Sequence, residues 1–149
     1  MTVLVDTSVL GRMANQADLA YPVAVAAVAE LHRRNEMLHI TPQNLIEFRN
    51  IATRPLALNG LGMSTIEANA AMERFEAKFP LLDDTPDIFA AWKAIVLTLG
   101  VVGKQVHDAR LVAVCHAHAV PKLLTFNSSH FNRFASFGPG IAVLNPANL

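Results

Sequence analysis

Four polar residues have the types and positions that metal-assisted chemistry requires. Asp6 directly follows the apolar, mostly β-branched run 3–5, and Asn127 follows the run 122–125 by two residues. Both runs have the composition of short buried strands. The carboxyl ends of parallel strands meet at one edge of a sheet, where ligands bind. We therefore expect Asp6 and Asn127 to lie at the same edge.

Asp108 is placed on a predicted helix that spans about residues 105–119. It lies in the first turn and shares one stripe with Val112, Cys115 and Ala119, at the spacing i, i+4, i+7 and i+11. Because the stripe is otherwise apolar, we expect this acid to face the interior of the protein.

Glu47 lies beside the apolar stripe of the predicted helix 43–53. Each acid also has an ordinary structural explanation. An Asp after a strand, such as Asp6, commonly caps a turn or helix. An acid in a first helical turn, such as Asp108, is stabilised by the helix macrodipole. Glu47 could simply be solvated, so no acid is assigned a function by itself.

The four residues carry more information as a set. Carboxylates that converge on one place repel each other unless a cation lies between them. Hard divalent ions such as Mg²⁺ and Mn²⁺ prefer carboxylate, amide and water oxygens. The candidate ligands are Asp6, Glu47, Asp108 and Asn127. The twelve basic and twelve acidic residues give the chain no net charge that would attract a polyanion. A bound divalent ion would attract phosphate through its own charge.

The elements that must position these residues alternate between short apolar runs and helical segments. We predict strands at residues 3–5, 37–40, 80–82, 122–125 and 140–144. We predict helices at about 21–35, 43–53, 65–78, 86–99 and 105–119. The remaining segments are a turn-like stretch through Gly11 to Asp18, a loop at 56–62 and a short helical or irregular piece at 128–134. This alternation predicts an α/β fold, a mainly parallel central sheet with helices on both faces.

Composition limits the class of protein. The chain of 149 residues fits a single domain over residues 1–149, and 52% hydrophobic against 16% charged residues argues against disorder. Its one cysteine, Cys115, excludes an internal disulfide and a zinc site built from several thiolates; within an apolar run it reads as a buried hydrophobe. No apolar run approaches the ~18 residues of a membrane span, so we expect a soluble, cytoplasmic protein.

Four strings in this sequence resemble those of the PIN-domain nucleases, and most of all the VapC toxins of bacterial toxin–antitoxin pairs. The strings are LVDTSVL at 4–10, PQNLIEF at 42–48, HDARLVA at 107–113 and LTFNSSHF at 124–131. The resemblance covers nearly the whole chain. It implies a three-layer α/β/α sandwich, an endoribonuclease dependent on Mg²⁺ or Mn²⁺, a VapB-type antitoxin as partner, and a homodimer.

The resemblance also implies roles for individual residues. Asp6, Glu47 and Asp108 match the family's acidic positions, and Ser8 matches the hydroxyl after the first acid. Asn127 stands where many members carry a further Asp, so this site would hold three carboxylates. Asp6 and Asp108 would be the primary metal ligands, and Glu47 a ligand of a second ion or a base acting through water.

The remaining candidates would support the reaction. Ser8, Thr125 and Asn127 would orient water or ligands. Arg12 and Lys104 flank the acids in the sequence and are the favoured contacts to RNA phosphates.

Two other functions remain open on the sequence alone. Phosphatases and phosphotransferases of the haloacid dehalogenase type also place an Asp after the first strand. They usually carry a second Asp two residues later, where this chain has Ser8. The other alternative is a weakly active or inactive PIN-like binding module that keeps the acids for structure, and Asn127 favours it.

Overall fold

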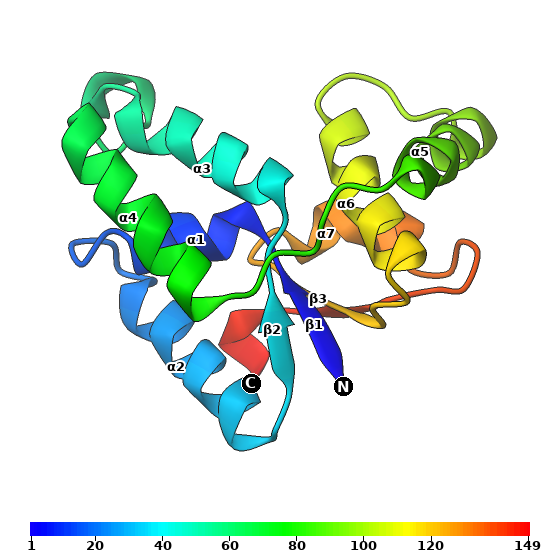
Figure 1. The fold of residues 1–149 in the computed structure, drawn as a ribbon, viewed down its shortest axis with the longest axis horizontal. Helices are drawn as coiled ribbons and strands as arrows, with labels where there is room; N and C mark the ends of the chain where they lie inside the picture. Colours follow the sequence, from blue (N-terminus) through cyan, green and yellow to red (C-terminus); the bar gives the residue numbers. More distant parts are fainter.

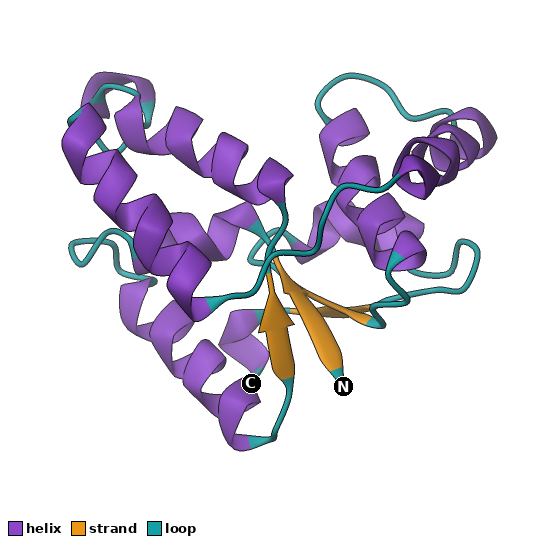
Figure 2. Cartoon of the chain, viewed as in Figure 1, coloured by secondary structure: helices purple, strands orange, loops and turns teal.

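The computed structural model describes residues 1–149 and contains a four-stranded parallel sheet between two groups of helices (Figure 1, Figure 2). The strands are β1 (Thr2–Val5), β2 (Met37–His39), β3 (Lys122–Leu124) and β4 (Ala142–Leu144). Their order in the sheet is β2-β1-β3-β4, and Leu4 lies between His39 and Leu123 in the register. The predicted parallel α/β sandwich is therefore confirmed.

Seven α-helices surround the sheet. They are α1 (Thr7–Met13), α2 (Tyr21–Arg33), α3 (Pro42–Thr53), α4 (Thr65–Lys78), α5 (Pro86–Leu99), α6 (Gln105–Ala117) and α7 (Ser128–Phe131). Short 3-10 turns follow at Leu56–Leu58, Asn132–Phe134 and Pro146–Asn148. Helices α1 to α4 lie on one side of the sheet, on the left in Figure 1, and α5 to α7 lie on the other. None of these helices combines the length and the apolar character needed to cross a membrane.

Three consecutive residues of the central strand β1, Val3, Leu4 and Val5, are apolar. Successive side chains of a strand point to opposite faces of the sheet. Val3 and Val5 pack into one core with Phe48 of α3, whereas Leu4 packs into a second core with Val112 of α6. Because both faces are covered by helices, Val3, Leu4 and Val5 are all fully buried.

Local sequence signals define most helix ends. The side chain of Ser64 accepts the N–H of Glu67, and the Glu67 side chain accepts the N–H of Ser64, so a capping box forms at the start of α4. Thr41 and Asn44 form the same arrangement at α3. Gly100 ends α5 in the left-handed conformation, with φ of 61°.

Helix α1 corrects the prediction of a turn-like stretch after the first strand. Residues 7–13 are helical because Asp6 acts as the N-cap, and its carboxylate accepts the N–H of Ser8 at 3.4 Å. Gly11 weakens helix propensity by about 1 kcal/mol. Val9 and Leu10 offset that cost, since both are fully buried in the first core.

The predicted strand at 80–82 is also wrong. Only one isolated bridge, between Ile40 and Leu81, joins this segment to the region of β2. Helices α2 and α6 end two residues before their predicted ends, because Asn35 and Ala119 adopt left-handed φ angles of 60° and 54°. The other elements agree with the predicted ranges to within two residues.

Candidate functional site

The predicted ligands meet in one hollow at the carboxyl end of β1. Asp6 comes from the end of β1, Glu47 from α3, Asp108 from α6 and Asn127 from the segment after β3. The hollow has a volume of about 240 Å³, and its other lining residues are Thr7, Ser8, Arg12 and Ile51. Acids more than 100 residues apart in the sequence thus share one pocket.

Asp6 is held in place by hydroxyl groups. Its side chain is nearly buried, with 5% of the residue exposed. The hydroxyl of Ser8 donates to Asp6 Oδ2 at 2.7 Å, and that of Thr125 donates to the same oxygen at 2.8 Å. Because the Ser8 N–H also reaches Oδ2, Oδ1 is the oxygen left for an interaction with a ligand.

The two hydroxyls also fix the segment that follows β3. Ser8 Oγ accepts the N–H of Phe126 at 3.1 Å, and Thr125 Oγ1 accepts the N–H of Asn127 at 3.0 Å. The main chain at Asn127 is therefore tied to the residues that hold Asp6. The Asn127 residue is exposed, and its side chain does not cap α7.

Glu47 is half-buried on the other side of the hollow. Its Oε1 accepts the hydroxyl of Thr7 at 3.2 Å and the amide of Gln43 at 3.4 Å. Burial and the charge of Asp6 raise the pKa of Glu47 to about 7, and these two hydrogen bonds only partly oppose the rise. This carboxyl group can therefore gain or lose a proton near neutral pH.

Asp108 experiences a similar environment. Burial, followed by the charge of Asp6, raises its pKa to about 6. His130 and His107 act in the opposite direction, and His130 Nδ1 lies 3.9 Å from Asp108 Oδ2. The acid thus shares its surroundings with two histidines as well as with the other carboxylates.

These acids fit a hard divalent cation by their chemistry. The available donors are oxygens, and mutual repulsion contributes to the raised pKa values of Glu47 and Asp108. A cation among them would relieve that repulsion. As the side chains stand, no group of three or more His, Cys, Asp or Glu is arranged to hold one ion. The acids therefore line one pocket, but their side chains are not in positions where all of them could bind the same ion.

Gln43 joins the two sides of the pocket, and sequence reasoning missed it. Its amide donates to the carbonyl oxygen of His107 at 2.9 Å, and Arg110 donates to its Oε1 at 2.9 Å. Gln43 thereby connects α3 to α6, the helices that carry Glu47 and Asp108. The one available signal was its position four residues before Glu47, on the same helix face.

The two predicted phosphate contacts differ in position. Arg12 lines the pocket, donates to the carbonyl oxygen of Ser8 at 3.0 Å and lies 4.6 Å from the centre of the Phe126 ring. Lys104 directly precedes α6, and it is not among the residues that line the pocket. Arg12 is therefore the cation that the structure brings to the acids.

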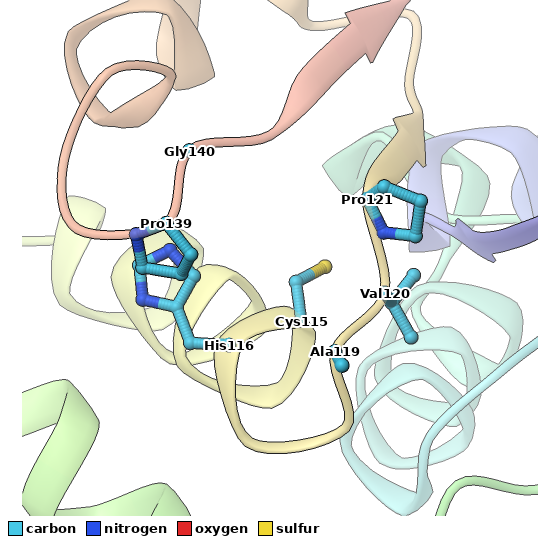
Figure 3. A pocket seen from close by; sticks show the side chains of 7 residues that line it. All are labelled: Cys115, His116, Ala119, Val120, Pro121, Pro139 and Gly140. Carbon is cyan, nitrogen blue, oxygen red and sulfur yellow. The ribbon is translucent and has the colours of Figure 1, made fainter.

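A separate hollow of about 180 Å³ lies at the opposite end of α6 from Asp108 (Figure 3). The residues that line it are Cys115, His116, Ala119, Val120, Pro121, Pro139 and Gly140. Burial raises the pKa of the Cys115 thiol to about 12, so this thiol stays protonated. The interpretation of Cys115 as a buried hydrophobe is confirmed.

Known structures share this fold along nearly the whole chain. VapBC-1 from nontypeable Haemophilus influenzae has a TM-score of 0.70 at 14% identity and covers 98% of each chain. VapBC2 from Rickettsia felis, bound to a DNA fragment from its promoter, has a TM-score of 0.67 at 16% identity and covers 97% of this chain and 98% of the other. Mycobacterium tuberculosis VapC20, described as a toxin that cleaves the Sarcin-Ricin loop, has a TM-score of 0.64 at 19% identity and covers 91% of this chain and 96% of the other.

The sequence itself agrees with the same family. No curated protein matches this chain by sequence. The family model of the PIN domain, however, matches residues 3–136, a span that includes all four predicted ligands. Both the PIN domains and the haloacid dehalogenases place an acid after the first strand. The match supports the PIN domain and argues against the haloacid dehalogenase alternative. The chain belongs to the PIN domain family.

Proposed function

We propose that this protein is a metal-dependent endoribonuclease and the toxin of a toxin–antitoxin pair. The observation that carries the proposal is the convergence of Asp6, Glu47 and Asp108 in one pocket of a PIN-domain chain. RNA as the substrate is supported by the likeness to VapC20, a toxin that cleaves the Sarcin-Ricin loop.

Mg²⁺ or Mn²⁺ is the proposed cofactor. Asp6 and Asp108 would hold it, with Glu47 and Asn127 as further oxygen donors on the pocket wall. When bound, the ion supplies Lewis acidity, which lowers the pKa of a water molecule and offsets the charge that builds on the phosphoryl oxygens.

The protein's own residues supply orientation and proton transfer. Ser8 and Thr125 hold Asp6 Oδ2, which fixes the orientation of the carboxylate in the pocket that Asp6 lines. Glu47 is held by the Thr7 hydroxyl and the Gln43 amide, and its carboxylate can accept a proton from water in the pocket. Arg12 would bind a phosphate of the RNA, and Lys104 would contact the strand outside the pocket.

The partners follow from the same resemblance. One solved structure of the same fold, VapBC-5 from Mycobacterium tuberculosis, is a member of the VapBC family of toxin–antitoxin systems. We infer that a VapB-type antitoxin binds this protein and inhibits it, that the toxin forms a homodimer, and that it acts on RNA in the cytoplasm.

RNA cleavage tests the proposal directly. The purified protein, freed of antitoxin, is incubated with a mixed RNA pool in Mg²⁺, in Mn²⁺ and in EDTA, beside Asp6→Asn and Asp108→Asn. We expect cleavage that needs the metal and that both substitutions abolish. Asp87→Asn is the matched control, because Asp87 is an exposed acid in the first turn of α5. Cleavage that persists in EDTA or in either pocket variant, or an intact protein that cuts no RNA, would contradict the proposal.

A further inference from the structure

A second hollow adjoins the acidic pocket. Its volume is about 260 Å³, and it shares Thr7, Ser8, Arg12 and Ile51 with the acidic pocket. Its lining residues that are absent from the acidic pocket include Arg54 and two residues of the turn that follows α3, Asn59 and Leu61. A ligand bound at the acids can therefore continue into this hollow without leaving the surface of the protein.

The second hollow has an excess of positive charge. Arg12 and Arg54 both line it, and neither guanidinium makes an ion pair with a carboxylate. Asp18 is the one acid on its wall, and its Oδ1 accepts the N–H of Ala20 at 2.8 Å. Two guanidinium groups in one hollow would attract an anion. The planar guanidinium can donate two parallel hydrogen bonds to phosphate oxygens.

The turn at 54–62 fixes the main chain at Arg54. The N–H of Gly62 donates to the carbonyl oxygen of Arg54 at 2.9 Å. Gly60 lies so close that a Cβ atom there would stand 2.0 Å from the same oxygen, so only glycine fits. Asn59 adopts a left-handed φ of 61° and lines the hollow from the same turn. The main chain of the turn is therefore constrained at Arg54 and at Asn59, whose side chains line the hollow.

We propose that this second hollow binds the RNA phosphate adjacent to the one that is cleaved. Arg12 and Arg54 would pair with the phosphate oxygens, and the Asn59 amide would donate to the strand. The RNA would then run from the acids past α1 toward the turn at 54–62. This assignment rests on the proposed function, because it takes RNA to be the ligand of the adjoining acids.

Binding measurements test the assignment without requiring cleavage. A labelled pool of short single-stranded RNA is titrated with Asp108→Asn protein at several salt concentrations, with and without Arg54→Ala. We expect Arg54→Ala to weaken binding about fivefold or more at low salt. Loss of one phosphate contact also reduces the slope of log K against log salt by about 0.7 for a single strand. Arg54→Lys should recover part of both effects.

Arg49→Ala is the matched control for charge. Arg49 lies on α3, the helix that ends directly before Arg54, but its guanidinium donates to Asn69 of α4 and is outside the hollow. Asn59→Gly is a second variant that keeps the left-handed backbone and removes only the amide. We expect it to weaken binding and leave the salt slope unchanged, since no charge is lost. Unfolding by circular dichroism verifies that each variant is folded.

The result that overturns the assignment is RNA binding that is absent, or that responds equally to Arg49→Ala and Arg54→Ala. If Arg54→Ala fails to fold, unchanged binding by Asn59→Gly overturns it as well. Failure of the proposed function gives a different result. The wild-type protein would then cut no RNA, but Arg54→Ala would still weaken RNA binding.

Discussion

At the scale of single residues, Glu47 is an acid whose negative charge is unfavourable in the absence of a cation. Its pKa rises from 4.5 to about 7 because it is half-buried beside Asp6. A raised pKa in an acid means that the folded protein favours the neutral form. The resulting stabilisation is complete below about pH 4.5 and is lost as the pH rises through 7.

Glu47→Gln should therefore raise the melting temperature in EDTA at pH 8 and change it little at pH 4. Thermal unfolding followed by circular dichroism at both pH values measures this difference. Glu67→Gln provides a control of opposite sign, because the capping interactions with Ser64 lower the pKa of Glu67. An equal effect of Glu47→Gln at the two pH values would show that the carboxyl group is not strained by its surroundings.

The sequence was sufficient to predict which acids share the pocket, since Asp6 and Asp108 occupy positions defined by a strand end and a helix start. The resemblance also pointed to Ser8 and Thr125, which hold Asp6, but the sequence did not identify the groups that hold Glu47. Thr7 and Asn44 form a chain to Glu47, in which the Asn44 amide donates to Thr7 Oγ1 at 3.2 Å. These partners come from different elements, so no local pattern in the sequence reports them.

At the scale of elements, the distance between α3 and α6 decides whether Glu47 and Asp108 can act together. Gln43 crosses between these helices, and Arg110 extends the connection to Asp84 with a contact of 3.1 Å. Gln43 itself is 9% exposed, so its hydrogen bonds are largely shielded from water. We regard it as a positioning residue for the two acids.

Gln43→Ala should lower the free energy of unfolding by about 1–2 kcal/mol, because it removes a bridge between partly buried groups. RNA cleavage by the folded variant should lose rate more than substrate affinity, since the acids move relative to each other. Chemical denaturation and steady-state kinetics measure the two effects. Gln105→Ala is the control, because Gln105 accepts an exposed hydrogen bond from Arg133; a similar loss in both variants would exclude a specific positioning role.

The elements differed in how well they could be predicted. Helix α4 spans the predicted residues because its capping box is formed by residues that are near each other in the sequence. Helix α1 was missed because its stability comes from burial of Val9 and Leu10 against distant elements. The segment at 80–82 has the apolar residues of a strand, but strand pairing depends on neighbours that the sequence does not identify.

At the scale of the whole molecule, the pocket lies where the two helical layers meet. Glu47 belongs to the layer of α1 to α4, Asp108 belongs to that of α5 to α7, and Asp6 ends the strand between them (Figure 1). A cation held by all three would connect both layers through the sheet. The fold therefore explains why acids so far apart in the sequence serve one site.

The most direct test of this account is Mn²⁺ binding, measured by titration calorimetry on the antitoxin-free protein at pH 8. We predict saturable binding that Asp6→Asn and Asp108→Asn each weaken by more than about tenfold. Asp87→Asn should bind Mn²⁺ as the wild type does. Binding that is absent from the folded wild-type protein, or that neither pocket substitution weakens, would contradict the assignment of Asp6, Glu47 and Asp108 to a metal site.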